Sequence, residues 1–151
     1  MATAGKETAV RIRAASLNDA GQLAELSGQL GYPSQAEEMK QRLERVQPDK
    51  EHALFVAEQQ GGRVVGWVHV FLYHSIENAT RAEVGGLVVD ERSRSQGVGH
   101  QLLARAEQWA REKGCRVIGL RSNVIRDRAH AFYEREGYTV SKTQKAFRKD
   151  L

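Results

Sequence analysis

The sequence predicts a single α/β domain with a mixed, twisted central sheet of about six to seven strands, flanked by about four helices. Three observations support this fold class. Two amphipathic helical patterns open the chain, three apolar runs typical of strands follow, and the longest helical pattern then leads into a further apolar run. Because a helix between two neighbouring strands joins them in parallel, the sheet is expected to be mixed. The length of 151 residues suits one domain covering residues 1–151.

Two short helices are expected near the N-terminus. Residues 1–9 are small and polar, and we expect them to be frayed. Ser16 is suited to cap a first helix, in which apolar residues recur at helical spacing until Gly31 ends it. Ser34 is suited to cap a second helix, which ends before Pro48.

Three strands are expected over residues 53–57, 64–73 and 81–89. The pair Gly61-Gly62 predicts a hairpin between the first two of them. The second strand is apolar on both faces, so we expect it to lie inside the sheet. The pair Gly85-Gly86 interrupts the third strand, and it predicts a bulge or the close approach of a ligand or another backbone.

The second half of the chain alternates helices and strands. A long amphipathic helix is expected over residues 97–113, followed by a strand over residues 117–120 that runs parallel to the preceding strand. A shorter helix over residues 126–136 has one aromatic face to bury. Two short strands, over residues 138–142 and 145–149, complete the expected sheet.

The composition excludes several classes of protein. The single cysteine, Cys115, rules out an internal disulfide and a multi-cysteine zinc site, and His69 and His74 are too few for a metal centre. No apolar run approaches the ~20 residues of a membrane-spanning helix. The N-terminus also lacks the apolar core of a secretory signal. We therefore expect a cytoplasmic protein with no metal and no membrane partner.

The net charge of +4 is unevenly distributed along the chain. Residues 91–128 carry nine basic and four acidic side chains. Such an excess attracts a polyanion, either a nucleic acid or a phosphorylated cofactor. Because the chain has no tract of Lys and Arg and no zinc-finger spacing, a nucleic-acid partner is not expected.

A polar loop between the third strand and the long helix predicts a phosphate-binding site. The helix opens with Gly97 and Gly99, and Arg94 adds a fixed positive charge just before them. The amide groups and the positive end of a helix suit a phosphate or a pyrophosphate. A nucleotide P-loop would require Lys where this chain has His100. A dinucleotide fingerprint would require a small residue where it has Leu102.

Two segments together resemble a known family. The pattern Arg94-x-x-Gly97-x-Gly99, directly after an apolar strand, resembles the acetyl-CoA pyrophosphate loop of the GNAT superfamily of N-acetyltransferases. Residues 123–138 resemble the second cofactor segment of that superfamily, with an Asn at a strand end and an Ala-x-x-Phe-Tyr helix before Gly-Tyr. The resemblance covers roughly residues 53–148. The two N-terminal helices lie where that family has its variable substrate region.

The resemblance implies a GNAT-like fold in which two central parallel strands splay apart and acetyl-CoA lies between them as the co-substrate. A backbone amide near Leu87 would polarise the thioester oxygen. No metal is implied. The residues that match the family's cofactor-binding positions are Leu87, Val88, Val89, Arg94, Ser95, Gln96, Gly97, Val98, Gly99, His100, Asn123, Ala129 and Phe132.

The reaction that the resemblance implies is direct transfer of acetyl to a primary amine in a ternary complex. Tyr133 matches the general acid of many family members, and Glu83 matches the base of some, with a water chain as the alternative. The acceptor is a small amine or, alternatively, a peptide N-terminus or lysine. A non-catalytic acyl-CoA-binding module is the other alternative. Some relatives form a homodimer through their C-terminal strands, and Phe147 would anchor such a contact here.

Overall fold

The computed structural model describes residues 9–151, so the expected fraying of residues 1–9 falls almost entirely outside the described residues. The described chain forms two compact units, one ending at Leu120 and the other running from Arg121 to Leu151. The first unit holds the sheet and three α-helices, and the second holds one α-helix. That residues 1–151 form one domain stays a prediction. No helix within the described residues has the length and apolarity that crossing a bilayer requires.

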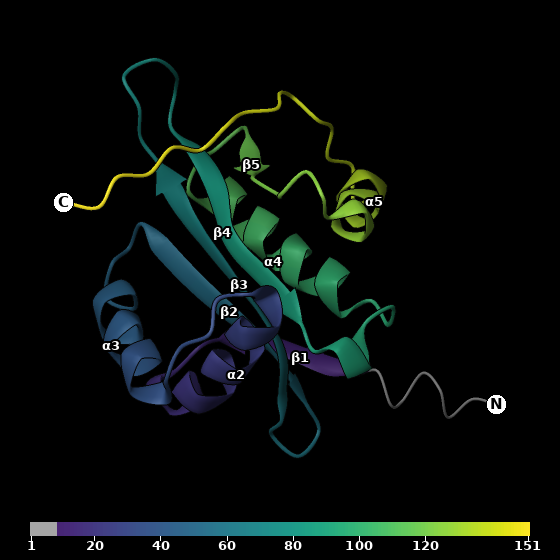
Figure 1. Ribbon diagram of the computed structural model, residues 1–151. Coiled ribbons are helices and arrows are strands. Elements are labelled where there is room, and N and C mark those ends of the chain that lie inside the picture. The colour runs from purple at the N-terminus through teal and green to yellow at the C-terminus, as the bar shows by residue number, and fades with distance from the viewer. Residues whose placement is uncertain (1–8) are drawn as a thin grey trace. The chain divides into compact units, whose positions relative to one another are not determined.

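A mixed sheet of five strands, rather than the expected six to seven, forms the centre of the first unit (Figure 1). The pairs from the first strand to the fourth are antiparallel, and the fifth strand runs parallel to the fourth, as the helical connection predicted. The third strand has a partner on each side, which explains its two apolar faces. The strands lie in chain order: β1 (Val10–Ala14), β2 (His52–Gln59), β3 (Val64–Tyr73), β4 (Arg81–Val89) and β5 (Ile118–Leu120).

The strand β1 has no counterpart among the expected elements. Its sequence, Val-Arg-Ile-Arg-Ala, alternates apolar and charged residues over only five positions, which is too short to separate a strand from a polar tail. It is an edge strand that pairs with β2 alone, in the register Val10 opposite Gln59. Pairing with a remote segment, rather than local composition, therefore creates this strand.

The two expected C-terminal strands, over residues 138–142 and 145–149, are wrong. The described residues after position 137 form no strand. Val140 and Phe147 are large apolar residues within these two ranges. Both are exposed, and 90% of the surface of Phe147 is accessible. A short hairpin is marginal in water unless a third strand or a helix covers one face. The homodimer through these strands stays a prediction.

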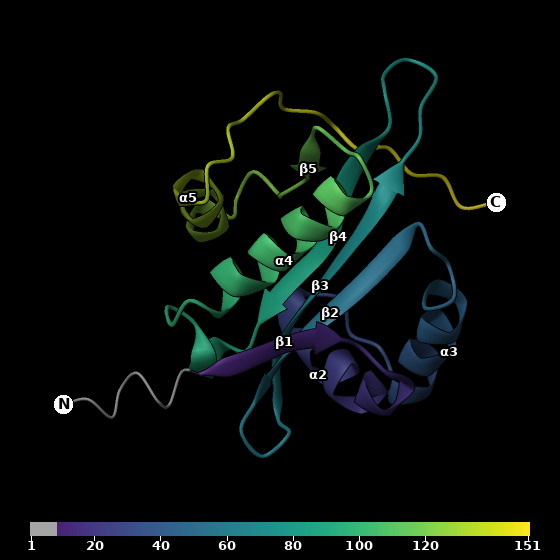
Figure 2. The same cartoon turned by 180° about the vertical axis from the view of Figure 1, so that it is seen from behind.

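Helices cover both faces of the sheet (Figures 1 and 2). On the first face, Leu23 and Leu43 pack against Val56 and Val88 in one apolar cluster. On the second face the fully buried Leu102 belongs to the long helix. The first face carries the short 3₁₀ helix η1 (Leu17–Asp19), α2 (Ala20–Leu30) and α3 (Ala36–Val46), and the second face carries α4 (Val98–Glu112).

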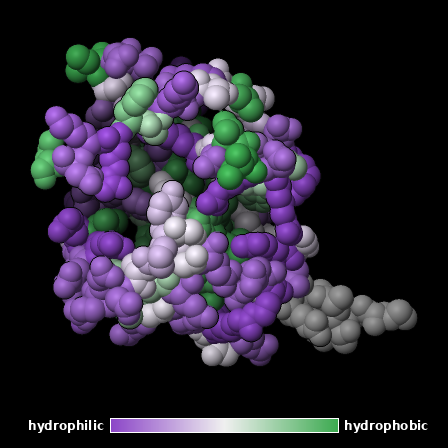
Figure 3. Space-filling view, in the orientation of Figure 1, coloured by the Kyte–Doolittle hydropathy of each residue, from purple (hydrophilic) through white to green (hydrophobic). Residues whose placement is uncertain are grey.

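Hydrophilic residues cover most of the surface visible in Figure 3, with small groups of hydrophobic residues between them. Among the described residues of the first unit, 9–120, the large hydrophobic side chains that are exposed belong to Tyr32, Ile76 and Val117. Each of these residues lies in a connection between two elements rather than within a helix or strand. The helices and strands of this unit therefore bury most of their apolar surface, and the hydrophobic effect holds the two helical layers against the sheet.

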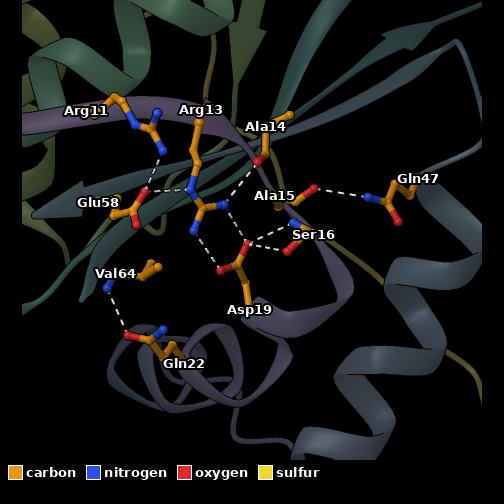
Figure 4. Close-up of polar contacts among 10 residues, drawn as sticks. All are labelled: Arg11, Arg13, Ala14, Ala15, Ser16, Asp19, Gln22, Gln47, Glu58 and Val64. Atoms are coloured by element: carbon orange, nitrogen blue, oxygen red, sulfur yellow. Dashed lines mark hydrogen bonds and ion pairs between the residues drawn. The ribbon is translucent and has the colours of Figure 1, made fainter. Parts of the chain in front are cut away.

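An ion-pair network ties β1 to η1 and β2 (Figure 4). The guanidinium of Arg13 donates to both carboxylate oxygens of Asp19, at 2.8 and 2.9 Å, and its Nε donates to Glu58 Oε2 at 2.7 Å. Ser16 N–H donates to Asp19 Oδ2 at 2.7 Å, which forms the predicted helix cap. The hydrogen bonds from Arg13 hold the pKa of Asp19, which is only 4% exposed, below its usual range.

Candidate active site

The ladder between β4 and β5 is short. It joins Ala82 to Ile118 and ends where Val84 pairs with Leu120. Strand β4 continues for the five residues 85–89, and within the described part of the chain no strand pairs with them on that side. An open strand edge offers N–H and C=O groups to any extended ligand that lies alongside it. The two parallel strands therefore part at the point where the expected fold requires it.

A bulge lies at the start of this open edge, as the pair Gly85-Gly86 predicted. Gly86 pairs with His69 and Val84 pairs with Val70, so Gly85 is the extra residue of β4. A β-carbon on Gly85 would lie 2.8 Å from Nδ1 of His69. One on Gly86 would lie 2.8 Å from the ring of Trp67. Only glycine fits at either position, because aromatic rings of β3 occupy the space of a side chain.

The loop after β4 begins with a buried carboxylate. Asp90 caps the 3₁₀ helix η2 (Glu91–Ser93) by accepting the N–H of Arg92 at 3.1 Å, and its Oδ2 lies 2.6 Å from Nη2 of Arg63. Burial alone would raise the pKa of Asp90, but the hydrogen bonds from Arg92 and Arg63 lower it below its usual value. Asp90 is therefore ionised at neutral pH and anchors the loop.

The helix α2 also holds this loop in place. Oε1 of Gln29 accepts the N–H of Glu91 at 3.0 Å, and Oε1 of Gln22 accepts the N–H of Val64 at 2.8 Å. Two amide side chains of one helix thus bond to η2 and to the first residue of β3. The α2 helix therefore helps to fix where the loop starts.

The second half of the loop turns its backbone outward. Arg94 folds back so that its Nε donates to the carbonyl of Val89 at 3.1 Å. Ser95 has a φ of 64° and Gly97 a φ of 83°, both in the left-handed region, which is strained for serine and easy for glycine. The residues from Ser95 to Gly97 are exposed. These two left-handed residues are separated by a single residue. Together they create a concave backbone of the kind that binds anions.

The helix α4 begins directly after this loop. Gly97 is its N-cap, and the first backbone hydrogen bond across the helix start runs from Gln101 N–H to the carbonyl of Gly97 at 3.1 Å. The first turn of an α-helix has amides that no carbonyl of the same helix can accept, and here that turn opens with Val98 and Gly99. Together with the helix dipole these amides favour an anion at this end. The structure thus brings together the open edge at Leu87 and Val89 and the predicted phosphate loop from Arg94 to His100.

One predicted cofactor residue, Val88, has no side chain available to a ligand at this edge. Val88 is buried in the apolar cluster under α2 and α3, so its side chain faces the core. Leu87 and Val89 are half-buried and point to the opposite face of the strand. An arm lying along this edge would therefore meet backbone groups and not the side chain of Val88.

Glu83 is buried rather than solvated, with 7% of the residue exposed. It lies two residues before Gly85, opposite Phe71 of β3 and Gly119 of β5. Its Oε2 lies 3.3 Å from Nε of Arg81, whose guanidinium stacks over the ring of Tyr73 at 4.5 Å. The carboxylate is therefore close to the open edge but is paired with a cation.

The other predicted site residues belong to the second unit. Asn123 closes a turn, because its Oδ1 accepts the N–H of Ile125 at 3.1 Å and its carbonyl accepts the N–H of Arg126 at 3.0 Å. The helix α5 (Asp127–Arg135) follows and carries Ala129, Phe132 and Tyr133. The ring of Tyr133 makes edge contacts with those of Phe132 and Tyr138. Burial raises the pKa of the Tyr133 phenol, so it stays protonated at neutral pH.

A cluster on the first face of the sheet was not expected from the sequence. His52 of β2 and His69 of β3 stack with ring centroids 5.2 Å apart, and Phe71 lies 5.4 Å from each. Nδ1 of His52 and Nε2 of His69 are 2.9 Å apart and share a hydrogen bond. Alternation along β3 places His69 and Phe71 on one face, but only the β2–β3 register brings His52 to them.

The described residues contain no group of three His, Cys, Asp or Glu side chains placed to hold a metal ion. That the protein needs no metal stays a prediction.

Comparison with known proteins identifies the family of this chain. Residues 21–138 match the model of the family described as the acetyltransferase (GNAT) family. The chain belongs to the GNAT family. The match spans α2, the sheet from β2 to β5, the loop and helix α4, and helix α5. The expected fold is thereby confirmed, with a smaller number of strands.

Named relatives of this GNAT protein transfer acetyl groups to amines. It is 32% identical over 148 residues to aminoglycoside N(6')-acetyltransferase type 1 of Stenotrophomonas maltophilia, with 95% of each chain covered. It is 40% identical over 83 residues to aminoalkylphosphonate N-acetyltransferase of Salmonella typhimurium, with 54% of each chain covered. The structure of aminoglycoside N-acetyltransferase AAC(6')-Iy in complex with CoA superimposes with a TM-score of 0.85 at 19% identity, covering 95% of this chain and 96% of that one. This GNAT protein is therefore an enzyme, an N-acetyltransferase acting on amines.

Proposed function

We propose that the protein transfers an acetyl group from acetyl-CoA to the primary amine of a small molecule, by direct attack in a ternary complex. One observation carries this proposal: the open edge of β4 leads without interruption into the phosphate-binding loop and the N-terminus of α4. A strand edge followed by an anion site suits a ligand that has an extended amide arm and a pyrophosphate at its end.

The residues of the first unit fit acetyl-CoA. A β-carbon on Gly97 would meet no atom within 4 Å, so the space beside this residue is open toward a ligand. The exposed backbone from Ser95 to Gly97 and the first amides of α4, at Val98, Gly99 and His100, would hold the pyrophosphate. The backbone of Leu87 and Val89 would pair with the pantetheine arm. Acetyl-CoA, when bound, supplies an activated acetyl thioester.

The family resemblance also assigns roles to residues of the second unit. Asn123, Ala129 and Phe132 would contact the cofactor, as the family resemblance implies. Tyr133 would donate a proton to the departing thiolate, and its raised pKa keeps that proton available. Leu87 N–H would stabilise the negative charge that develops on the thioester oxygen.

The proton acceptor for the amine is proposed to lie on the first face of the sheet. Glu83 is one candidate and a water chain is the other. Oε2 of Glu83 lies 3.3 Å from Nε of Arg81, and this contact occupies one of the two carboxylate oxygens, which weighs against Glu83 as the direct base.

The proposed acceptor class is a small amine, because of the substrates for which two relatives are named. The relative that covers 95% of this chain is named for aminoglycosides and the other for aminoalkylphosphonates, and both of these are small molecules that carry amines. A peptide amine is the alternative acceptor. We also propose that the protein acts in the cytoplasm, without a nucleic-acid partner.

Thermal unfolding with acetyl-CoA tests the co-substrate. At about 100 times its dissociation constant, a ligand stabilises the folded state by about 2.7 kcal/mol. For a chain of this size that raises Tm by roughly 5–11 °C. ATP and NAD⁺ serve as controls that carry phosphates without the pantetheine arm. No shift with millimolar acetyl-CoA, or an equal shift with ATP, would contradict the proposed cofactor site.

Thiol release with a panel of amines then tests the acceptor. The panel contains an aminoglycoside, an aminoalkylphosphonate, a polyamine and a peptide with a free N-terminus. We expect turnover with at least one small amine and little with the peptide. Faster turnover with the peptide would overturn the proposed acceptor class, and binding of acetyl-CoA without any turnover would favour a binding module.

A further inference from the structure

A pair of hydrogen-bonded histidines lies next to the bulge of β4. His69 is directly opposite Gly86 in the β3–β4 ladder, and its Nδ1 lies 2.8 Å from the position that a β-carbon of Gly85 would occupy. The next residue of β4 is Leu87, whose amide is proposed to face the thioester oxygen. The Nδ1 edge of His69 is therefore within one residue of the part of the strand where the acetyl group is proposed to lie.

The other ring nitrogen of His69, Nε2, faces His52 of β2. This atom lies 2.9 Å from Nδ1 of His52, and the two rings are nearly parallel, with an interplanar angle of 14°. Nε2 of His52 in turn lies 3.9 Å from Oδ2 of Asp49. The side chain of His52 is 29% exposed and that of Asp49 is 49% exposed. Three side chains thus form a line from the bulge to solvent.

Asp49 favours one arrangement of protons along this line. A carboxylate attracts an N–H, so it favours the His52 tautomer that carries its proton on Nε2. In that tautomer Nδ1 of His52 is an acceptor, and the proton of the shared hydrogen bond must then reside on Nε2 of His69. The neutral ring of His69 is left with a lone pair on Nδ1, the nitrogen that faces the bulge.

We propose that His69 is the base that takes the proton of the acceptor amine, and that His52 and Asp49 position it and carry the proton to solvent. This inference rests on the proposed function and names the proton acceptor which that function requires. His69 is then a catalytic residue, whereas His52 and Asp49 are positioning residues.

The proton balance of the step is complete. As the amine nitrogen forms its bond to the carbonyl carbon, the amine proton moves to Nδ1 of His69, and the Nε2 proton of His69 moves to Nδ1 of His52. His52 releases its Nε2 proton to solvent beside Asp49. The carbon–sulfur bond breaks with its electron pair going to sulfur, which takes a proton from Tyr133. Exchange with water then restores the starting tautomers of both imidazoles and returns a proton to the phenolate of Tyr133.

The charges around His69 keep its lone pair free. On β2 it faces His52, and on β4 the charged groups of the same face are Glu83 and Arg81, which pair with each other. Burial, with a further contribution from His52, lowers the pKa of His69 to about 4. The imidazole is therefore neutral at neutral pH, so that it can accept a proton.

Steady-state kinetics of His69→Gln, with the amine identified by the thiol-release panel, test the inference. The Gln amide keeps an N–H donor near the position of Nε2 but cannot accept a proton at that of Nδ1. We expect kcat to fall by about 10²-fold with the KM for acetyl-CoA unchanged. We also expect free imidazole to restore part of the activity of His69→Ala. The matched control is His74→Asn, since His74 lies just beyond the far end of the same strand and contacts Thr80 and Glu51.

A second set of variants separates relay from structure. His52→Asn keeps an acceptor near the Nδ1 position but cannot pass a proton on, so its kcat should fall. The double variant His52→Asn, His69→Gln should have the same kcat as His69→Gln alone, because both residues act in one relay. Glu83→Gln should have the smaller effect on kcat. An unchanged kcat in His69→Gln, or a large loss in Glu83→Gln alone, would overturn the inference.

The outcomes distinguish this inference from the proposed function. If the wild-type protein shows no acetyl-CoA shift and no turnover with any amine, the proposed function fails. If the wild type turns over and His69→Gln is equally active, the function stands and the role of His69 is wrong. A His69→Gln variant that loses its acetyl-CoA shift as well as its activity has lost structure at the bulge, and this also counts against a purely chemical role.

Discussion

Nδ1 of His69 occupies the space beside Gly85, 2.8 Å from where a β-carbon at that position would lie. An aromatic ring of one strand thus rests on the bare backbone of the next, at the point where β4 leaves its parallel partner. The bulge and the imidazole are therefore interdependent: the ring can lie there only because position 85 has no side chain. This relationship leads directly to a test.

We expect Gly85→Ala to lower both stability and kcat. The added methyl group displaces the ring of His69, and overpacking of this kind costs about 1–3 kcal/mol. The matched control is Gly28→Ala within α2, where a β-carbon would meet nothing within 4 Å and alanine is the better helix former. Chemical denaturation and thiol-release kinetics measure both effects. Equal stability of the two variants would contradict the close contact.

We expect Gly97→Ala to weaken acetyl-CoA binding. Its φ of 83° costs alanine about 1–2 kcal/mol of strain, and the side chain also enters the space proposed for the pyrophosphate. Gly114→Ala is a close control, because Gly114 has the same φ of 83° and equally open surroundings at the other end of α4. Both variants should lose similar stability, but only Gly97→Ala should reduce the acetyl-CoA-induced rise in Tm. Equal reductions of this rise in the two variants would show that the loop is not part of the cofactor site.

We expect Tyr133→Phe to lower kcat and leave the affinity for acetyl-CoA nearly unchanged. The substitution removes the phenolic proton while keeping the ring that contacts Phe132 and Tyr138. Tyr138→Phe is the control for loss of a hydroxyl in the same unit. Steady-state kinetics and thermal shift with acetyl-CoA provide the two readouts. An unaltered kcat would end the assignment of Tyr133 as the acid.

We expect Asp19→Asn to destabilise the fold by about 3 kcal/mol, because it removes the charge that pairs with Arg13. The control is Asp150→Asn, since the pair of Asp150 with Arg148 is exposed and should be worth little. The depressed pKa of Asp19 stabilises the fold above the carboxyl's unfolded pKa, and this stabilisation is lost as pH falls through the folded pKa. Urea denaturation from pH 7 to pH 3 should therefore show that the free energy of unfolding falls less on acidification in Asp19→Asn than in the wild type.

We expect His69 to titrate near pH 4, far below the ordinary value of 6.5. Because the unfolded chain binds this proton at higher pH than the folded one, His69 makes the fold less stable as pH falls from about 6.5 to 4. The full effect is about 3 kcal/mol. NMR titration of the imidazole signals measures the pKa, and His69→Gln should flatten the pH dependence of stability over that interval. A pKa near 6.5 would contradict the burial of the ring.

The parts of the site that depend on local geometry were predictable from the sequence. Gly97 must adopt a positive φ to begin α4, and the amphipathic stripe of that helix follows from its own residues. The bulge at Gly85-Gly86 was likewise expected, because two successive glycines inside an apolar strand are typical of an irregular ladder. The resemblance to the family then predicted acetyl-CoA as the co-substrate, because its two motifs are each contained in a short stretch of sequence.

The parts that were missed depend on contacts between distant segments. The register between β2 and β3 decides that His52 lies beside His69, and the pairing of β1 with β2 turns a short polar segment into a strand. The residues over 138–142 and 145–149 have a plausible strand pattern but do not pair. The family match marked Glu83 as a candidate base, but only the folded sheet shows that this residue is buried and paired with Arg81.

The sequence by itself thus determined the order of the elements from α2 to α5, the loop that suits a phosphate and the family to which the chain belongs. Each of these depends on backbone dihedrals, helix caps or periodicity, which neighbouring residues control. Only the tertiary structure decided where β4 separates from β5, which strands exist at the edges and how Asp49, His52 and His69 align. Those features arise from hydrogen bonds and packing between remote residues, whose free energies exist only once the sheet has formed.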